Sequence, residues 1–205
     1  MPGYFIALEG IDGVGTTTQA RLLADWLQAK GRDCLLTAEP SAGTIGTFLR
    51  QALKGSYALP PPAMALLFAA DRLDHLAREI RPTLADGLVV VSDRYLFSSL
   101  AYQSVGNEAA WVEAINSRAR EADLTILLDA PVEACLQRVK LRDGWLMDLY
   151  EKAEFLSQVR QNYLDLAAQP GRSKGKVVVI PGESPVEEVA SAVARVVEGL
   201  LALPS

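Results

Sequence analysis

The sequence predicts an α/β fold with a parallel sheet, because short apolar runs alternate with longer segments of helical periodicity along the whole chain. The expected strands are continuous apolar runs, as in buried parallel sheets. A glycine-rich turn joins the first run to the first helix, an order typical of phosphate-binding α/β proteins. The 205 residues contain no internal repeat and no long linker, so we expect one domain, residues 1–205.

The first half of the chain contains three expected strands, at residues 4–8, 34–38 and 88–92. We expect a first helix at 17–30, where Gly31 provides a stop. A second runs from Thr44, its expected cap, to about residue 54. A third occupies 63–80 and closes near Pro82, because proline cannot continue a helical hydrogen-bond pattern.

The second half adds strands at 124–129 and 176–180. Helical segments are expected between them, near 131–140 and 148–168, and an amphipathic helix from about 185 to 201 closes the chain. The alternation of strands and helices therefore continues to the end.

Composition excludes several classes of partner. A net charge of −5 and a pI near 5.0 argue against a nucleic-acid or anionic-membrane surface. Cys34 and Cys135 form no metal-ligand cluster with His75, the single histidine, and are expected to be reduced core thiols. With no basic leader and no apolar segment of membrane-spanning length, we expect a cytosolic, cytoplasmic protein.

The glycine-rich turn predicts an anion site. Gly10, Gly13 and Gly15 allow the backbone to approach a ligand, so that amide N–H groups and the following helix N-terminus converge on it. Against the pattern G-x-x-x-x-G-K-[ST], Gly10, Gly15 and Thr17 match, but Thr16 stands at the lysine position. The alternative is a glycine-rich turn that binds nothing.

Three separated stretches carry a more specific pattern: Leu8-Glu-Gly-Ile-Asp-Gly-Val-Gly15 with Thr17-Thr-Gln19, Leu66-Leu-Phe-Ala-Ala-Asp-Arg72 with His75, and Asp93-Arg-Tyr-Leu-Phe-Ser-Ser-Leu-Ala-Tyr-Gln103. In order and spacing they resemble the thymidylate kinase family of P-loop nucleoside monophosphate kinases over essentially the whole chain. The third stretch is the most specific, since other nucleotide kinases share only the loop.

The resemblance implies a P-loop NTPase-type three-layer α/β/α fold, with a five-stranded parallel sheet, helices on both faces and a short lid at about residues 138–150. It implies a homodimer that transfers the γ-phosphoryl group of ATP, bound with Mg²⁺, to dTMP. The product, dTDP, would serve dTTP synthesis for DNA replication.

The resemblance also assigns roles to the loop and to the end of the third strand. The Thr17 hydroxyl would bind Mg²⁺, and Asp93 would approach it through water. Asp12 and Arg94 would be catalytic, with Arg94 on the acceptor's phosphate. The residues implied to cradle ATP are Gly10, Ile11, Asp12, Gly13, Val14, Gly15, Thr16, Thr17 and Thr18.

The residues themselves support an anion at Arg94, because an unpaired guanidinium directly after a buried strand is costly. A structural role of Asp93 and Arg94 in salt bridges at the sheet edge is the alternative. The resemblance further implies that an acceptor pocket is lined by Ser98, Ser99, Tyr102 and Gln103, with the tyrosine favouring deoxyribose.

Phe68 and Arg72 lie four residues apart in an expected helix, so they share a face and together offer a flat ring and a forked donor. The resemblance implies that Phe68 stacks on thymine and that Arg72 hydrogen-bonds its exocyclic oxygen. From the residues alone, an ordinary core phenylalanine and a solvated surface arginine remain the alternative. For His75, which follows Arg72 by three residues, we expect a structural role.

A cation from elsewhere must replace the loop lysine if the chain transfers phosphate, because the transferring group carries negative charge. Arg142 matches a catalytic arginine of the lid, and our hypothesis is that Arg142, helped by Arg138 or Lys140, supplies that charge. A second lid arginine is absent, since Leu149 follows Asp148. Arg50 is an expected further contact to phosphate.

Two alternatives to an active dTMP kinase remain. One is a nucleotide-binding homologue that has lost the transfer, because the loop lysine and one lid arginine are absent. The other is a kinase for another monophosphate, such as UMP, CMP or dUMP.

Overall fold

The computed structural model of the protein describes residues 3–143, 149–169 and 175–201. Parallel strands form a five-stranded sheet in the order β2-β3-β1-β4-β5. Their bounds agree with the expected strands to within one residue at each end: β1 (Phe5–Glu9), β2 (Cys34–Ala38), β3 (Val89–Asp93), β4 (Leu124–Asp129) and β5 (Lys176–Pro181). In the register of the sheet, Leu8 of β1 lies opposite Asp93 of β3 and Ile126 of β4.

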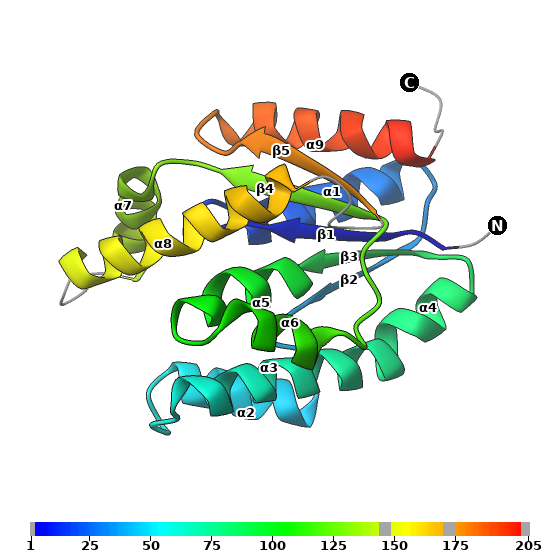
Figure 1. The fold of residues 1–205 in the computed structure, drawn as a ribbon. Helices are drawn as coiled ribbons and strands as arrows, with labels where there is room; N and C mark the ends of the chain where they lie inside the picture. Colours follow the sequence, from blue (N-terminus) through cyan, green and yellow to red (C-terminus); the bar gives the residue numbers. More distant parts are fainter. Residues whose placement is uncertain (1–2, 144–148, 170–174, 202–205) are drawn as a thin grey trace.

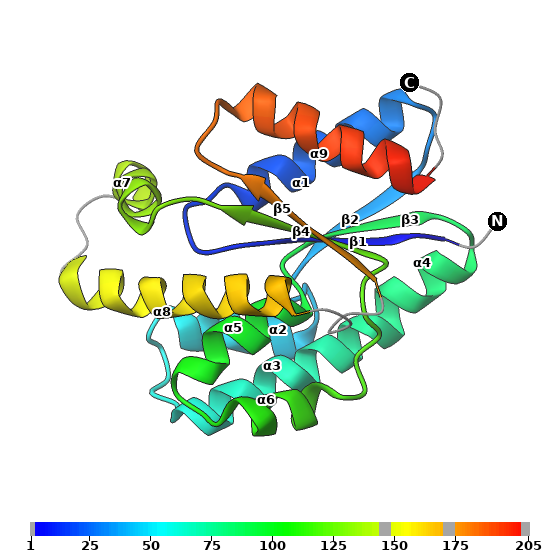
Figure 2. The same ribbon diagram turned by 45° about the horizontal axis from the view of Figure 1, so that its top comes forward.

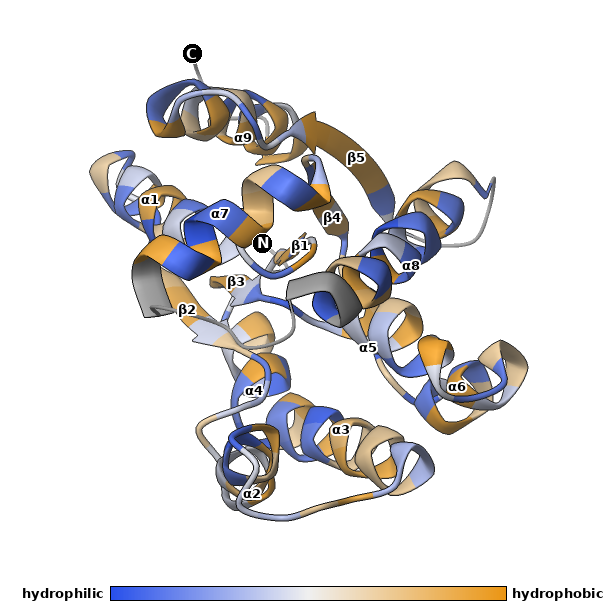
Figure 3. Ribbon diagram, turned by 90° about the vertical axis from the view of Figure 1, so that its left-hand side faces the viewer, coloured by the Kyte–Doolittle hydropathy of each residue, from blue (hydrophilic) through white to orange (hydrophobic). Residues whose placement is uncertain are grey.

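Helices cover both faces of the sheet, so the predicted three-layer arrangement is confirmed (Figure 1). On one face lie α1 (Thr16–Ala29) and α9 (Val186–Leu201). On the other lie α3 (Pro61–His75), α5 (Leu96–Tyr102), α6 (Ala109–Asn116) and α8 (Leu149–Ala168), as the turned view makes clear (Figure 2). Figure 3 shows strands that are mostly hydrophobic, surrounded by helices that carry both hydrophobic and hydrophilic stretches.

The core lies on both faces because successive residues of a strand point to opposite sides. Ile6 and Leu8 of β1 belong to a large cluster that includes apolar residues of α1, α8 and α9. Phe5 and Ala7 belong to a smaller cluster with Ile80. With both faces filled, the carboxyl ends of the strands remain for ligands.

The helix expected at 63–80 begins earlier and continues further than the sequence predicted. It starts at Pro61, a favoured first position, and α3 passes directly into a π-helical segment, Leu76–Ile80, and then into α4 (Arg81–Ala85). The expected end near Pro82 is therefore wrong. Pro82 lies directly after the π-helical turn, whose hydrogen bond from the Arg81 N–H to the Leu76 carbonyl oxygen is made just before it.

The remaining helices include two that the sequence analysis did not place, α5 and α6, which lie between β3 and β4. In α2 (Thr44–Leu53), Gly43 occupies the cap position and Thr44 is the first helical residue, so the expected threonine cap is wrong. The expected helices after β4 are confirmed as α7 (Val132–Asp143), α8 and α9.

Within the described ranges, we find no helix with the length and apolar character needed to cross a bilayer.

Candidate functional site

The glycine-rich turn lies between β1 and α1, at the carboxyl ends of the central strands. Gly13 has a φ of 88°, and a Cβ there would lie 2.3 Å from the carbonyl oxygen of Cys135 on α7. Gly10 is similarly enclosed, since a Cβ would lie 2.6 Å from the carbonyl oxygen of Leu128. Both the backbone conformation and the close approach of β4 and α7 therefore require glycine.

This loop borders a cavity of about 610 Å³. Thr16, Thr17 and Thr18 line it from the first turn of α1, where unpaired backbone N–H groups and the helix dipole favour an anion. Among the described residues around it, the basic side chains are those of Arg94 and Arg138. The other lining residues are Asp12, Gly13, Val14, Gly15, Gln19, Val139, Gly182, Glu183, Ser184, Pro185, Val186 and Val189.

Thr17 and Asp93 meet at the edge of this cavity. The Thr17 hydroxyl donates to Asp93 Oδ2 at 2.5 Å. The second oxygen, Oδ1, is buried without a hydrogen-bond partner among the described residues. Hydroxyl and carboxylate oxygens are the donors that Mg²⁺ prefers. Since the described side chains form no cluster of three or more His, Cys, Asp or Glu residues, phosphate and water would complete such a site.

Arg94 follows β3 and reaches back over the loop. Its Nη2 donates to Asp12 Oδ1 at 2.7 Å and its Nη1 to the carbonyl oxygen of Gly10 at 2.8 Å. Arg94 therefore forms a salt bridge with Asp12 at the edge of the sheet. Arg94 has a φ of 69°, in the left-handed region that non-glycine residues rarely adopt, and such strain concentrates at functional sites.

Glu9, which the sequence analysis did not select, holds the residues that follow this strained turn through hydrogen bonds. It is buried at the end of β1. Its Oε1 accepts from the backbone N–H of Tyr95 at 3.0 Å, and its Oε2 accepts from Ser98 at 2.6 Å and from Tyr163 at 3.1 Å. Burial raises the pKa of the Glu9 carboxyl, against the hydrogen bond from Ser98 and the charge of Arg94. An acidic residue directly after an expected buried strand was the signal for it in the sequence.

A second cavity, of about 510 Å³, lies beyond Arg94. Of the expected acceptor residues, five line it together with Arg94: Phe68, Arg72, Ser98, Tyr102 and Gln103. Its other lining residues are Asp12, Glu39, Pro40, Leu53, Pro61, Met64, Tyr95, Val105, Gly106, Asn107 and Phe155. Asp12 and Arg94 line both cavities, so the two spaces meet at this ion pair.

Tyr102 accepts a hydrogen bond from the backbone N–H of Asp12 at 2.9 Å, and its ring lies against the Arg94 guanidinium. Burial raises the pKa of Tyr102 to about 12. The hydroxyl is therefore protonated at neutral pH, and its proton is available to a ligand as a donor.

Arg72 is buried, with 1% of its surface exposed, so the reading of a solvated surface charge is wrong. Its Nη1 donates to Ser99 Oγ at 3.0 Å and to Asn116 Oδ1 at 2.5 Å. Its Nη2 donates to Glu39 Oε2 at 2.5 Å and to the carbonyl oxygen of Tyr95 at 2.9 Å. Ser99 therefore lies behind Arg72 and does not line the cavity, in contrast to the expectation.

Two polar atoms of this cavity's lining residues are buried without a partner in the described structure: the Nε–H of Arg72, a donor, and the Oε1 of Gln103, an acceptor. Buried polar groups in native proteins are nearly always satisfied. An orphaned donor and an orphaned acceptor in one cavity indicate a ligand that offers an acceptor and a donor.

The other arginines are placed differently from the expectations. Arg50 donates to the carbonyl oxygens of Pro40 and Ser41, at 2.8 and 2.5 Å, so it braces the loop after β2. Arg138 donates to the carbonyl oxygens of Val14, at 3.3 Å, and Gly182, at 3.0 Å. Lys140, the other expected helper, lies on α7. The side chain of Arg142, and residues 144–148 of the expected lid, lie outside the described residues.

Comparisons with known proteins agree with this site. The family model described as thymidylate kinase matches residues 8–193. A probable thymidylate kinase of Pyrococcus horikoshii is 48% identical over 177 residues, covering 82% of this chain and 84% of that protein. A thymidylate kinase of Leifsonia xyli subsp. xyli is 43% identical over 199 residues, covering 93% of this chain and 92% of that protein.

The matched region includes the glycine-rich loop, the ion pair of Asp12 with Arg94, and both cavities' principal residues. This chain is a member of the thymidylate kinase family.

Proposed function

We propose that the protein transfers the γ-phosphoryl group of ATP, bound with Mg²⁺, to the phosphate of dTMP, giving ADP and dTDP. The observation that carries this proposal is the meeting of two cavities at Asp12 and Arg94. One cavity suits the phosphates of a donor and the other suits a nucleotide acceptor. The Arg94 cation lies between them, where negative charge develops during transfer.

The donor side is proposed to bind ATP through the loop amides of residues 10–18 and the N-terminus of α1. Thr17, and Asp93 through water, would hold the magnesium ion, and the orphaned Asp93 Oδ1 fits that assignment. Bound there, magnesium neutralises phosphate charge.

The acceptor side favours a base with an acceptor and a donor on neighbouring atoms. Thymine and uracil offer the O4 acceptor and the N3–H donor, which match the free donor of Arg72 and the free acceptor of Gln103. Cytosine offers the reverse pair, an N4–H₂ donor and an N3 acceptor. It would place a donor against the Arg72 donor and an acceptor against the Gln103 acceptor. Phe68, on the same wall, provides a ring for stacking.

In the proposed reaction, an oxygen of the acceptor's phosphate forms a bond to the γ-phosphorus, and the bond from that phosphorus to the β–γ bridging oxygen breaks. The electron pair leaves with ADP. The attacking phosphate is largely ionised at neutral pH, so no strong general base is needed. Positioning by Arg94 and neutralisation of charge account for the catalysis.

Thr16 leaves the donor phosphates without the usual lysine, and our hypothesis remains that a basic side chain of the 138–142 segment replaces it. Arg142 was the first choice from the sequence. Arg138 gains support because it lines the loop cavity, where the described partners of its guanidinium are neutral backbone carbonyls.

The deciding experiment incubates the purified protein with ATP, Mg²⁺ and, separately, dTMP, dUMP, UMP and CMP, and measures ADP formation. We expect the greatest kcat/KM with dTMP, weaker turnover with dUMP and little with CMP. Binding of dTMP without turnover would instead support a homologue that has lost the transfer.

We further propose that the active form is a cytoplasmic homodimer of one domain per chain, with the segment at about 138–150 as a lid over ATP. Large apolar side chains on α3 support the dimer. Leu66 and Leu73 are 50% and 40% exposed on this helix and lie seven residues apart, on one side of it.

A further inference from the structure

A buried chain of polar contacts begins at Arg72 and continues away from the base cavity. All four N–H bonds of its two terminal amino groups have acceptors in the protein, and only the buried Nε–H has no partner among the described residues. The direction of that last donor is fixed by the acceptors behind it. Of these, Glu39 alone is charged, and it forms the ion pair with Arg72.

Glu39 uses its two oxygens for two different partners. Oε2 accepts from Arg72, and Oε1 lies 3.2 Å from Nδ1 of His75. The carboxylate is only 2% exposed, so water does not substitute for a missing partner. Arg72 and His75 are three residues apart on α3 and reach the same carboxylate from one side of the helix.

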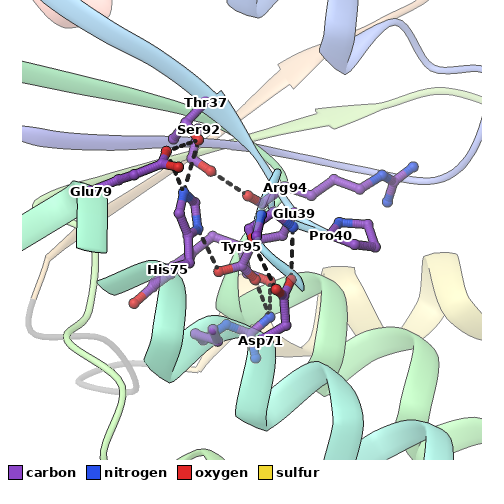
Figure 4. A network of polar contacts seen from close by, with 12 residues as sticks. Thr37, Glu39, Pro40, Asp71, His75, Glu79, Ser92, Arg94 and Tyr95 are labelled. Carbon is purple, nitrogen blue, oxygen red and sulfur yellow. Dashed lines mark hydrogen bonds and ion pairs between the residues drawn. The ribbon is translucent and has the colours of Figure 1, made fainter. Parts of the chain in front are cut away.

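His75 is held from its other ring nitrogen as well, which Figure 4 shows: Glu39 lies on one side of the ring, with Thr37 and Glu79 on the other. Nε2 lies 2.8 Å from Thr37 Oγ1, and that hydroxyl donates to Glu79 Oε2 at 3.1 Å. A carboxylate oxygen only accepts hydrogen bonds, so Nδ1 donates to Glu39, while Nε2 is hydrogen-bonded to the Thr37 hydroxyl. Both ring nitrogens are therefore engaged.

Secondary structure explains this convergence. Strand β2 supplies Thr37 and ends just before Glu39, while α3 supplies Arg72 and His75. The π-helical segment that follows α3 supplies Glu79. π-helical turns inside helices are often found at functional sites.

We propose that His75 is a positioning residue for recognition of the acceptor base: it fixes the Glu39 carboxylate, which fixes the Arg72 side chain in the wall of the base cavity. His75 does not touch the nucleotide. Its effect is on acceptor affinity, with little effect on the donor site around the phosphate loop. This inference rests on the proposed function only in taking the ligand of the 510 Å³ cavity to be a nucleotide base.

The test measures dissociation constants for dTMP and for ATP by calorimetry, in the wild type, His75→Leu and His75→Asn. Leucine removes both ring nitrogens, whereas the asparagine amide retains a donor at the position of Nδ1. We expect His75→Leu to weaken dTMP binding about tenfold, a common effect of removing a residue that holds a ligand-binding group in place. ATP binding should weaken by less than about twofold. His75→Asn recovers most of the dTMP affinity.

Two controls separate positioning from loss of packing. Leu76→Ala removes a fully buried side chain next to His75 in the sequence and should lower the melting temperature without changing the dTMP-to-ATP affinity ratio. In an Arg72→Met background, His75→Leu should add nothing to the loss of dTMP affinity, because its effect acts through Arg72. Equal losses for dTMP and ATP, or additive losses with Arg72→Met, would overturn the proposal.

The outcome is distinguishable from a failure of the proposed function. A wild-type protein that prefers dUMP or UMP, or that binds without turnover, contradicts the proposed dTMP kinase activity. The inference on His75 is then tested on whichever monophosphate the wild type binds most tightly, with the same variants. A wild type that binds none of the four monophosphates overturns both.

Discussion

At the scale of single residues, the site is built from charged side chains whose partners are fixed. Asp12 pairs with Arg94, and Glu39 forms a buried pair with Arg72. Removing one partner of a buried pair leaves an uncompensated charge, which is far more costly than the pair is stabilising. Substitutions here therefore change function and stability together, and matched controls are needed to separate the two.

The identity of the cation that replaces the loop lysine is one prediction at this scale. We expect Arg138→Met to lower kcat about 100-fold, because it removes positive charge from the phosphate cavity. Adding Thr16→Lys to this variant should restore at least part of the rate. Steady-state kinetics with ATP, Mg²⁺ and dTMP measure both effects.

The parallel series with Arg142→Met tests the rival choice. If Arg142→Met, and not Arg138→Met, lowers kcat and is rescued by Thr16→Lys, the charge comes from Arg142. Arg118→Met, at an exposed position that lines neither cavity, serves as the control and should leave kcat unchanged. If neither arginine affects kcat and Thr16→Lys is also silent, the idea of a replacement cation is wrong.

Glu9 gives a pH-dependent prediction. Burial raises its pKa in the folded protein above the value of 4.5 taken for a free carboxyl, so the folded state holds this proton more tightly than the unfolded chain does. The stability that Glu9 contributes is present below that value and is lost as the pH rises towards the folded-state pKa. Glu9→Gln cannot ionise and should not lose it.

Urea unfolding of both proteins across pH 4 to 8 measures this difference. Relative to Glu9→Gln, the free energy of unfolding of the wild type should fall with rising pH and then level off. A difference between the two proteins that does not change with pH would contradict the assignment.

At the scale of elements, the phosphate loop depends on how α7 packs against it. Gly13 contacts the backbone of α7 at Cys135, and the same helix carries Arg138 into the loop cavity. The loop's shape is therefore set by a helix more than a hundred residues away in sequence, in addition to its own glycines.

Gly13→Ala should destabilise the protein by roughly 1–3 kcal/mol, because alanine strains the positive φ and collides with the carbonyl oxygen of Cys135. We also expect weaker ATP binding. Thermal unfolding and calorimetric titration measure the two effects. Gly199→Ala is the matched control: a Cβ there meets nothing within 4 Å, and alanine in α9 should be neutral or slightly stabilising. Equal behaviour of the two variants would show that the contact with α7 is unimportant.

At the scale of the whole molecule, the sheet order brings β1 and β3 side by side, so the loop after β1 and the turn after β3 share one edge. The two cavities meet there. Leu66 and Leu73, on the exposed apolar side of α3, line neither cavity, which leaves them available for the proposed dimer.

Leu66→Glu combined with Leu73→Glu should convert a dimer into a monomer, because two charges would be buried at the interface. Light scattering coupled to size-exclusion chromatography measures the mass directly. Leu141→Glu, at a position 89% exposed on α7, is the control and should leave the mass unchanged. A wild type of monomer mass would contradict the dimer.

The sequence by itself determined the fold class and all the strands to within a residue, because buried strands and glycine turns are encoded locally. Through the resemblance to a kinase family it also indicated part of the lining of both cavities, including Arg72, Arg94 and Tyr102. It missed α5 and α6, and it ended the long helix too early, because the π-helical segment before Pro82 has no local signature. Burial also has no local signature, so Arg72 could be interpreted as a surface charge until its neighbours were known.

Only the tertiary structure decided which charges pair. Asp12 and Arg94 are 82 residues apart, and Glu39 and Arg72 are 33 apart, so no local pattern connects them. It also decided that Ser99 lies behind Arg72, that Glu9 supports the strained turn at Arg94, and that His75 holds Glu39. Residue types and spacing predict which groups can do the chemistry, whereas the packing of distant elements determines which of them meet in a low-dielectric interior and which remain free for a ligand.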